Sequence, residues 1–238
     1  MKKTIVIGAT SGIGRGIAKL LADDGCKVGI TGRRTELLEE LKAEKPVSYI
    51  IKTFDICDTK TTIEKLQELI DELGGLDLLV ISSGTGYLNE PLAFDLEELT
   101  INTNVLGFTN IVDWVFKYFV KQKSGHLAAI TSIAGLRGSR YAPAYSSSKS
   151  YQIKYLEAMR QKANHLKLPI YITDIRPGFV DTAMAQSNLI FWVASVKKAS
   201  KQIFGAIKRK RKIVYVTKRW RLLAIVFKLI PRPVSDRM

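Results

Sequence analysis

Histidine and cysteine are scarce in this chain of 238 residues, which contains two of each. Cys26 and Cys57 lie far apart, and His126 and His165 have no partner at the spacing of a metal motif. We therefore expect neither a zinc site nor a disulfide framework. Residues 1–3 lead directly into a predicted strand, so we expect no signal peptide and a reducing, cytoplasmic location.

Acidic residues are nearly absent from the C-terminal part of the chain. Residues 197–238 contain fourteen Lys and Arg and one acidic residue, Asp236, so this part accounts for +13 of the net charge of +15. Its apolar segment, within residues 218–231, is about a dozen residues long, whereas a bilayer-spanning helix needs about 20. This segment is therefore too short to span a membrane.

The rest of the chain alternates strand-like and helix-like stretches without a repeat, a linker or low-complexity sequence. The helical pattern is clearest at residues 62–73, and the strand-like stretches are residues 4–8, 27–31, 47–54, 76–82, 127–132, 170–175 and 213–216. This pattern predicts the α/β class: a single Rossmann-type, doubly wound parallel sheet of about seven strands flanked by helices, with a basic amphipathic helix at the C-terminus. We expect a catalytic domain at residues 1–217 and a C-terminal segment at 218–238 that is not an independent domain.

A glycine-rich turn follows the first predicted strand. Gly8, Gly12 and Gly14 lie between that strand and the helical pattern that begins near Ile17. The first glycine permits a tight turn, the second lets the backbone approach a pyrophosphate, and the third lets the helix pack on the strand. The turn and its position predict a dinucleotide site.

Tyr145 and Lys149 are four residues apart, and Ser132 lies thirteen residues before the tyrosine. On a helix, this spacing places the phenol and the ammonium group on one face. A nearby cation favours the phenolate, and Ser132 can hold a substrate oxygen, so the three residues predict proton transfer at a carbonyl. The alternative is a packed tyrosine and a solvated lysine that share this spacing by chance.

These motifs together resemble the short-chain dehydrogenase/reductase family over residues 4–182. Asn104 resembles the family's active-site asparagine, with Asn102 close enough to be an alternative, and Pro177, Gly178 and Thr182 resemble the segment that binds the nicotinamide carboxamide. The resemblance implies a catalytic set of Asn104, Ser132, Tyr145 and Lys149. It implies cofactor contacts from Gly8, Thr10, Ser11, Gly12, Ile13, Gly14, Arg33, Asp55, Ile56, Gly84, Tyr145, Lys149, Pro177, Gly178, Val180 and Thr182.

The resemblance also implies a role for each catalytic residue. Tyr145 transfers the proton at the substrate oxygen, and Lys149 lowers the pKa of the tyrosine and binds the nicotinamide ribose. Ser132 orients the carbonyl, and Asn104 anchors a water that links Lys149 to solvent. One departure is that residues 81–84 read Ile-Ser-Ser-Gly, where the family has Asn-Asn-Ala-Gly. Serine thus replaces an amide that usually braces the central strand.

The preferred cofactor is indicated by the end of the second predicted strand. Arg33 and Arg34 follow Gly32, and no Asp or Glu is present to bind a free ribose 2′-hydroxyl. A guanidinium group attracts a 2′-phosphate, whereas a carboxylate would repel it, so we expect NADP(H) and assign Arg33 to the phosphate. A purely solvated loop charge is the alternative, which fits Arg34 better than Arg33.

The C-terminal helix admits three readings. Lys218, Arg221 and Lys228 share one sector of a helical projection, and the apolar residues Trp220, Leu222, Leu223, Val226, Phe227 and Ile230 spread over the opposite side. Residues 218–231 therefore suit an anionic membrane surface. The helix could instead pack on the domain or in a homo-oligomer, a dimer or tetramer. Nucleic acid is the weakest alternative, because no aromatic platform accompanies the charges.

The substrate is indicated by the segment after Thr182. Met184, Phe191 and Trp192 lie where the family has a mobile substrate loop, and this apolar stretch has no charge to bind a carboxylate or phosphate. We expect a reductase of a hydrophobic or lipid-like ketone. The alternatives are a soluble reductase of small carbonyls and a catalytically silent nucleotide-binding scaffold, against which the complete catalytic set argues.

Overall fold

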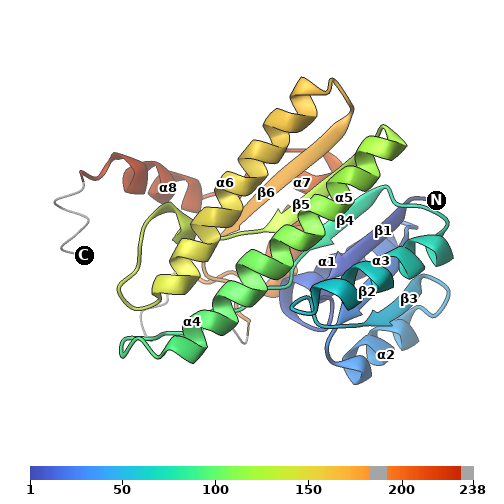
Figure 1. The fold of residues 1–238 in the computed structure, drawn as a ribbon, viewed down its shortest axis with the longest axis horizontal. Coiled ribbons are helices and arrows are strands. Elements are labelled where there is room, and N and C mark those ends of the chain that lie inside the picture. The colour runs from blue at the N-terminus through green and yellow to red at the C-terminus, as the bar shows by residue number, and fades with distance from the viewer. Residues whose placement is uncertain (183–191, 232–238) are drawn as a thin grey trace.

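The computed structural model describes residues 1–182 and 192–231, which form one seven-stranded parallel sheet between two layers of helices (Figure 1). The strand order is β3-β2-β1-β4-β5-β6-β7, and the strands are β1 (Lys3–Ile7), β2 (Lys27–Gly32), β3 (Tyr49–Thr53), β4 (Leu78–Ile81), β5 (Gly125–Ile130), β6 (Ile170–Pro177) and β7 (Ile213–Val216). The predicted doubly wound α/β fold is confirmed.

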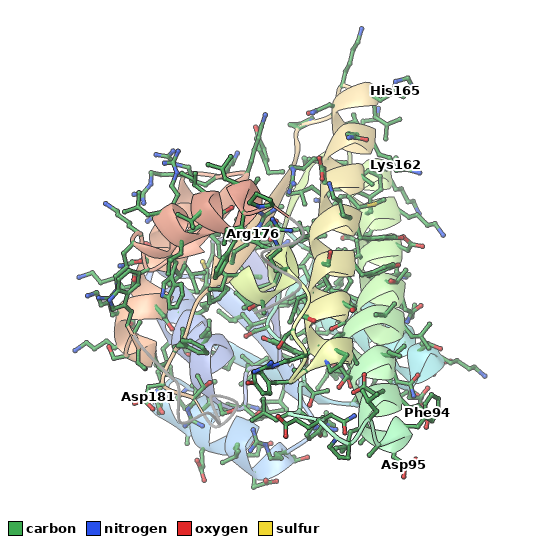
Figure 2. All side chains as sticks on the ribbon, turned by 90° about the vertical axis from the view of Figure 1, so that its left-hand side faces the viewer. Phe94, Asp95, Lys162, His165, Arg176 and Asp181 are labelled. Atoms are coloured by element: carbon green, nitrogen blue, oxygen red, sulfur yellow. The ribbon has the colours of Figure 1, made fainter. Side chains whose placement is uncertain are left out.

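Two hydrophobic cores lie on the two faces of the sheet. One face is covered by α1 (Gly12–Asp23), α2 (Thr35–Glu44) and α7 (Val196–Lys208). The other is covered by α3 (Thr59–Leu73), α5 (Phe108–Gln122) and α6 (Pro143–His165). Figure 2 shows α5 and α6 side by side along the molecule, from Phe94 and Asp95 of α4 (Phe94–Ile101) to His165 at the far end. Both faces of the sheet are thus covered by helices and shielded from water, as is usual for a parallel sheet.

Several predicted boundaries were wrong by two or three residues. The predicted strand at 47–54 begins only at Tyr49, because Val47 is 91% exposed in the preceding turn. The predicted helix at 62–73 begins three residues earlier, where the Asp58 side chain accepts a hydrogen bond from the Thr61 amide and caps the helix. The predicted strand at 127–132 ends at Ile130, before the chain enters the short helix Ile133–Leu136.

The topology creates a crevice at the carboxyl ends of the central strands. The chain runs from β1 outward to β2 and β3, then returns to the other side of β1 to form β4. Ile7 of β1 pairs with Ile81 of β4, so the two strands end at the same level. The loops after them diverge to opposite sides, and ligands of open α/β sheets bind at such a point.

The C-terminal helix α8 (Trp220–Leu229) packs on the domain beside β7. Trp220 is 1% exposed and Ala224 is 2% exposed, whereas Leu222 is 67% exposed. The apolar residues that the helical projection grouped opposite the cations are therefore divided between a buried and an exposed side of α8. Along the described part of the chain, no helix combines the length and the apolar character needed to cross a membrane.

Candidate active site

The turn between β1 and α1 brings its backbone against the end of β4. Gly8 has a φ of +84°, and a Cβ atom on it would lie 2.6 Å from the Ser83 backbone nitrogen. Only glycine avoids both the strained conformation and this clash. The helix begins at Gly12, so its first amide groups face the crevice and form a site suited to a phosphate.

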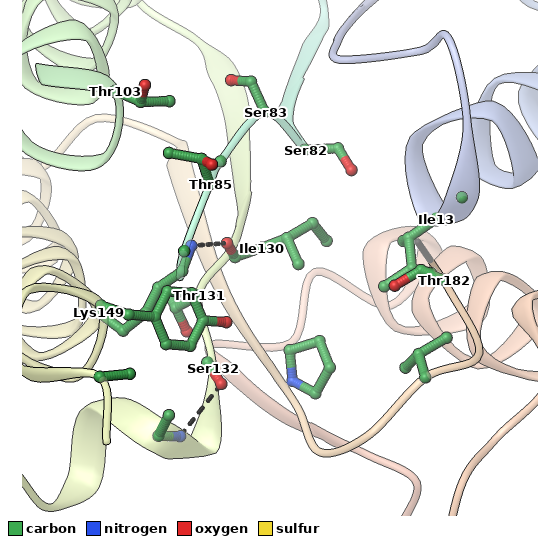
Figure 3. A pocket seen from close by; sticks show the side chains of 18 of the residues that line it. Ile13, Ser82, Ser83, Thr85, Thr103, Ile130, Thr131, Ser132, Lys149 and Thr182 are labelled. Atoms are coloured by element: carbon green, nitrogen blue, oxygen red, sulfur yellow. Dashed lines mark hydrogen bonds between the residues drawn. The ribbon is translucent and has the colours of Figure 1, made fainter. Parts of the chain in front are cut away.

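A cavity of about 1810 Å³ opens at this end of the sheet. It exceeds the ~300–1,000 Å³ of a pocket for one small ligand, so it has room for a dinucleotide and a substrate. Figure 3 shows Ser132 and Lys149 on one side and Ile13 and Thr182 on the opposite side. The cavity is lined by these predicted site residues: Gly8, Thr10, Ser11, Gly12, Ile13, Arg33, Asp55, Ile56, Gly84, Ser132, Tyr145, Lys149, Pro177, Gly178, Val180 and Thr182.

Gly14 and Asn104 support the cavity from behind. A Cβ atom on Gly14 would lie 2.0 Å from the Gly8 carbonyl oxygen, so this glycine lets α1 pack against the turn. Asn104 is fully buried in a π-helical turn (Asn102–Gly107) between α4 and α5. Its side-chain oxygen accepts from the Thr85 amide at 3.0 Å, and its side-chain nitrogen donates to the Thr85 carbonyl at 2.6 Å. Asn104 therefore braces the segment that follows β4.

Ser132, Tyr145 and Lys149 converge on the cavity from two elements. Ser132 follows β5, and the other two lie in the first two turns of α6, which starts at Pro143, where a missing amide hydrogen is no cost. The hydroxyl of Ser132 accepts a hydrogen bond from the Ala134 amide at 3.1 Å and lies close enough to Tyr145 to affect its pKa. Nζ of Lys149 lies 5.8 Å from the centre of the tyrosine ring. A carbonyl held by both hydroxyl groups would receive a hydrogen bond from each.

Lys149 is held by a network of protein groups. Its Nζ donates to the Ile130 carbonyl at 3.2 Å and to Oε1 of Gln152 at 3.0 Å. Nε2 of Gln152 donates in turn to the backbone carbonyl of Asn104 at 2.9 Å. A glutamine side chain thus connects Lys149 to the backbone of Asn104. The water that the resemblance places on Asn104, as a link from Lys149 to solvent, stays a prediction.

Burial dominates the electrostatics of the tyrosine and the lysine. It raises the pKa of Tyr145, and the nearby hydroxyl of Ser132 lowers this pKa only in part. Burial lowers the pKa of Lys149 to about 8, and the charge of Asp174 opposes that change. The predicted lowering of the tyrosine pKa by Lys149 is thus not seen, because the cost of burying the phenolate outweighs the opposing effect of Ser132. At neutral pH, Tyr145 is therefore protonated, beside a lysine that is still mostly protonated.

The two arginines after β2 differ from their predicted arrangement. The Arg33 side chain is 74% exposed and forms a 3.5 Å ion pair with Asp55. Arg34 donates to Oγ1 of Thr10 at 2.8 Å and to Oγ of Ser11 at 3.0 Å. Both arginines are exposed, but the guanidinium group of Arg34 is bound to the glycine turn, so the alternative of a purely solvated loop charge does not describe it.

The far end of the cavity is closed by α8. The Trp220 ring lies against the backbone of Gly178, where a Cβ atom would be 2.0 Å from the ring. Phe227 and Ile230 line the same end together with Arg137. Of the predicted substrate-loop residues, Met184 and Phe191 lie outside the described part of the chain. Trp192 is 42% exposed and packs edge-on against Trp220 at 5.7 Å.

A family model described as short chain dehydrogenase matches residues 2–189. This match covers more than half of the chain. The chain belongs to the short-chain dehydrogenase family. It is therefore an oxidoreductase of a family that uses a nicotinamide cofactor.

Individual relatives agree with this assignment. An uncharacterized oxidoreductase of Myxococcus xanthus is 33% identical over 192 residues, which cover 79% of this chain and 75% of that protein. Dehydrogenase/reductase SDR family member 7B of Mus musculus is 26% identical over 235 residues, covering 90% and 72% of the two chains. A serine dehydrogenase in its closed form, complexed with NADP+, matches with a TM-score of 0.81 at 24% identity, covering 90% of this chain and 94% of that one. The last likeness concerns the fold.

The cavity of this short-chain dehydrogenase fits such a cofactor. Gly8 lets the turn lie against the end of β4, Gly12 leaves room between the turn and the Thr182 side chain, and the amide groups at the start of α1 offer donors to a pyrophosphate. Pro177, Gly178 and Thr182 also line the cavity, with the Thr182 side chain next to Gly12. The donor set and the shape therefore match an extended dinucleotide.

The sequence analysis did not identify two groups of buried polar residues beside the cavity of this dehydrogenase. Gln152 is 1% exposed and lies one helical turn beyond Lys149, a spacing that could have identified it. Beneath Ser132, Oγ1 of Thr131 donates to Oδ1 of Asp174 at 2.6 Å, and Arg176 donates to the other oxygen of Asp174 at 2.8 Å. Asp174 is fully buried, and alternation in a strand gives no sign of such a pair.

Proposed function

We propose that this short-chain dehydrogenase is an NADP(H)-dependent oxidoreductase that interconverts a hydrophobic, lipid-like ketone and the corresponding secondary alcohol. The observation that carries the proposal is the convergence of Ser132, Tyr145 and Lys149 on a cavity that begins at a phosphate-binding turn. A bound nicotinamide supplies or accepts the hydride. The protein's own groups supply the proton, the orientation of the carbonyl and the exclusion of water.

The catalytic roles follow from the protonation states. Tyr145 has a raised pKa, so it is protonated at neutral pH and can donate its proton to the carbonyl oxygen of the substrate. Ser132 donates a second hydrogen bond to that oxygen. Lys149, held by Gln152 and the Ile130 carbonyl, places a positive charge beside the phenol and stabilises the phenolate left after transfer. The network through Gln152 to Asn104 fixes the position of that charge.

Two observations support NADP(H) as the cofactor. Arg33 and Arg34 directly follow β2, and neither β2 nor its end contains an Asp or Glu. The carboxylate paired with Arg33 is Asp55, which follows β3. Arg34 already lies against the phosphate-binding turn, so its guanidinium group is placed to meet a 2′-phosphate. A serine dehydrogenase of the same fold is complexed with NADP+. Both arginines are therefore assigned to the phosphate in this proposal.

The substrate class is supported by the distal end of the cavity. Phe227, Ile230 and the indole of Trp220 line this end, and Leu88, Leu99 and Ile133 add apolar side chains to the same cavity. Arg137 is the charged group closest to α8, and its Nε and Nη2 donate to the carbonyl oxygens of Phe227 and Ile230 at 2.6 and 2.5 Å. These two bonds hold Arg137 against α8, so the apolar side chains of α8 form the wall beside it, which is suited to an apolar chain.

A direct assay tests this function. NADPH oxidation would be followed with a series of ketones of increasing chain length, in parallel with NADH. We expect turnover that rises with chain length and that Tyr145→Phe abolishes. Turnover confined to short, polar carbonyls would overturn the substrate class, and equal use of NADH would overturn the cofactor preference.

Two partners are also part of the proposal. An anionic membrane surface on the cytoplasmic side is favoured for residues 218–231, because the chain has no Asp or Glu between Asp181 and Asp236. In this proposal, residues 1–217 form the catalytic domain and residues 218–238 form the C-terminal segment.

A homo-oligomer is favoured by Leu106, which is 56% exposed beside α5, and by the stacked Tyr151 and Tyr155 on α6. Sedimentation velocity would show a dimer or tetramer.

A further inference from the structure

Helix α8 carries two apolar stripes instead of one. The first consists of Trp220, Leu223, Ala224 and Phe227, which are buried or half-buried against the domain. The second, here called the outer stripe, consists of Leu222, Ile225, Val226 and Leu229. Each set has the spacing i, i+3, i+4, i+7 of a single helix face. An amphipathic helix on a globular protein needs only the first stripe, so the second calls for a partner.

The outer stripe is strongly exposed. Leu222 and Leu229 are 67% and 75% exposed, and Ile225 and Val226 are 48% and 50% exposed. Four large apolar side chains in one row form a continuous patch, which is unusual on a surface that faces only water. The helix is ten residues, or about 15 Å, long and can lie on a bilayer but cannot cross it.

The surroundings of the outer stripe are basic. Lys218, Arg219 and Arg221 are exposed at the start of α8. No acidic residue occurs in the sequence from residue 182 to residue 235, so nothing within this segment neutralises these charges. An apolar row flanked by unopposed cations is the combination that binds anionic lipid, through burial in the acyl region and attraction to the headgroups.

The inner side of the same helix belongs to the cavity. Trp220, Phe227 and Ile230 line its distal end. Arg137, directly after the short helix that follows Ser132, holds the two carbonyl groups at the end of α8. The outer stripe and the apolar end of the cavity therefore lie on opposite sides of one helix.

We propose that the outer stripe docks on an anionic lipid bilayer and that docking brings the apolar end of the cavity to the lipid, so that the substrate enters from the bilayer. The entry step rests on the proposed substrate class, whereas docking does not. A second copy fits the stripe less well, because a two-fold contact would bring uncompensated basic segments together. Nucleic acid would match the charge but leave the apolar row in water.

Docking is tested first without any substrate. The full chain would be sedimented with vesicles of phosphatidylcholine alone and with about 30% phosphatidylglycerol. We expect binding to the anionic vesicles, weakened by about 0.5 M salt. Leu222→Ser, Ile225→Ser and Leu229→Ser together should weaken binding on the order of a hundredfold, and Lys218→Gln with Arg221→Gln about tenfold.

A matched control removes exposed apolar residues elsewhere. Val47 lies before β3, at the opposite edge of the sheet from β7, and Leu166 lies just beyond the far end of α6. They are 91% and 43% exposed, so Val47→Ser with Leu166→Ser should leave binding unchanged. Melting temperatures would verify that every variant folds. Failure of the intact protein to bind anionic vesicles, or equal binding by the triple variant, would overturn docking. Loss of a dimer in the triple variant without vesicles would assign the stripe to a second copy.

Entry from the bilayer is tested with two ketones. One has a long chain and is embedded in the vesicles, and the other is short and water-soluble. We expect the triple variant to lose at least tenfold in turnover of the embedded ketone and to keep kcat for the soluble one, because the outer stripe does not line the cavity. Equal loss for both ketones would overturn entry from the bilayer. An intact protein that binds vesicles but reduces neither ketone would refute the proposed function and the entry step, while docking would stand.

Discussion

Gln152 accepts a hydrogen bond from Nζ of Lys149 at 3.0 Å, within a site where both side chains are almost completely buried. A buried ammonium group is costly unless acceptors surround it. Gln152 supplies one acceptor and the Ile130 carbonyl supplies another, while the carboxylate of Asp174 acts from a greater distance. The glutamine therefore fixes the position of Lys149, and as an acceptor it favours the charged form of the lysine.

We expect substitutions of Gln152 to move the pH profile in opposite directions. Activity should decline above pH 8, where Lys149 loses its proton, since its pKa is about 8. Gln152→Leu removes an acceptor and should shift this decline to lower pH. Gln152→Glu places a carboxylate beside the ammonium group and should shift it upward by about one to three pH units. The pH dependence of kcat/KM for both variants is the measurement.

A purely structural role for Gln152 would give a different result. Both variants would then lose activity uniformly at every pH, and the position of the decline would not change. Tyr145 does not produce such a decline in this range, because burial keeps its pKa above the ordinary value of about 10.

Tyr145→Phe tests the proton donor itself. The change removes only a hydroxyl group from a half-buried ring, so we expect the melting temperature to stay close to that of the unmodified protein. Turnover should fall by about 10²–10⁴-fold, the usual contribution of general acid catalysis. Steady-state NADPH oxidation and a thermal melt check the two halves of the prediction. A folded variant with retained turnover would exclude Tyr145 as the donor.

The arginines after β2 should control the choice of cofactor. Arg34→Ala should weaken NADPH binding by about 2 kcal/mol, because Arg34 is already fixed against Thr10 and Ser11. Arg33→Ala should have a smaller effect, since its side chain is 74% exposed and paired with Asp55. NADH serves as the internal control, measured by the same titration. A variant that loses NADH and NADPH equally would show that its arginine shapes the loop and does not bind a phosphate.

These arginines show which features of the site can be predicted from the sequence and which cannot. Glycines after an apolar strand, or a tyrosine and a lysine four residues apart, determine local geometry, so the dinucleotide turn and the placement of Tyr145 and Lys149 together could be predicted. One of the two adjacent arginines turns toward Thr10, and the packing of β2 against the glycine turn decides which one. No local sequence pattern contains that information. The first class of prediction rests on neighbours in the chain, and the second on neighbours in space.

Helix α8 shows a second limit of sequence reasoning. A periodic pattern identifies an apolar stripe, but α8 has two, and the pattern does not state which one meets the domain. The choice depends on Trp220, whose ring fits against Gly178 because that residue has no side chain. The burial of Asp174 and Arg176 could not be predicted from the sequence either. Two charges in a strand are compatible with burial only when they pair with each other, and the pattern does not show that pairing.

Trp220 should be essential for stability, unlike the outer stripe of the same helix. It is 1% exposed and contacts Phe179 edge-on at 5.7 Å, so Trp220→Ala should lower the free energy of unfolding by about 3–5 kcal/mol. Leu222→Ser, on the exposed side, should change it by less than about 1 kcal/mol. Denaturant titration of both variants compares the two faces. Equal, small losses would mean that α8 does not dock on the domain in solution.

His126 should make the protein less stable in acid. Its ring is 7% exposed and shares a 2.8 Å hydrogen bond with Thr173, and burial lowers its pKa to about 4. In the unfolded chain the pKa is about 6.5, so between these values the unfolded state binds the extra proton. Stability therefore falls as the pH drops from 6.5 towards 4, by about 2 kcal/mol at pH 5, and is unaffected by this group above pH 7.

The difference in unfolding free energy between pH 7 and pH 5 isolates this effect. His126→Gln has its own constant cost in packing, but that cost cancels when the same variant is compared at the two pH values. We expect the variant's pH dependence to be about 2 kcal/mol smaller than that of the unmodified protein. His165→Gln, at the exposed end of α6, is the matched control and should keep the full pH dependence. If His126→Gln kept it as well, the acid sensitivity would have to arise from carboxylates, because the buried imidazole would then not be the group that binds the proton on unfolding.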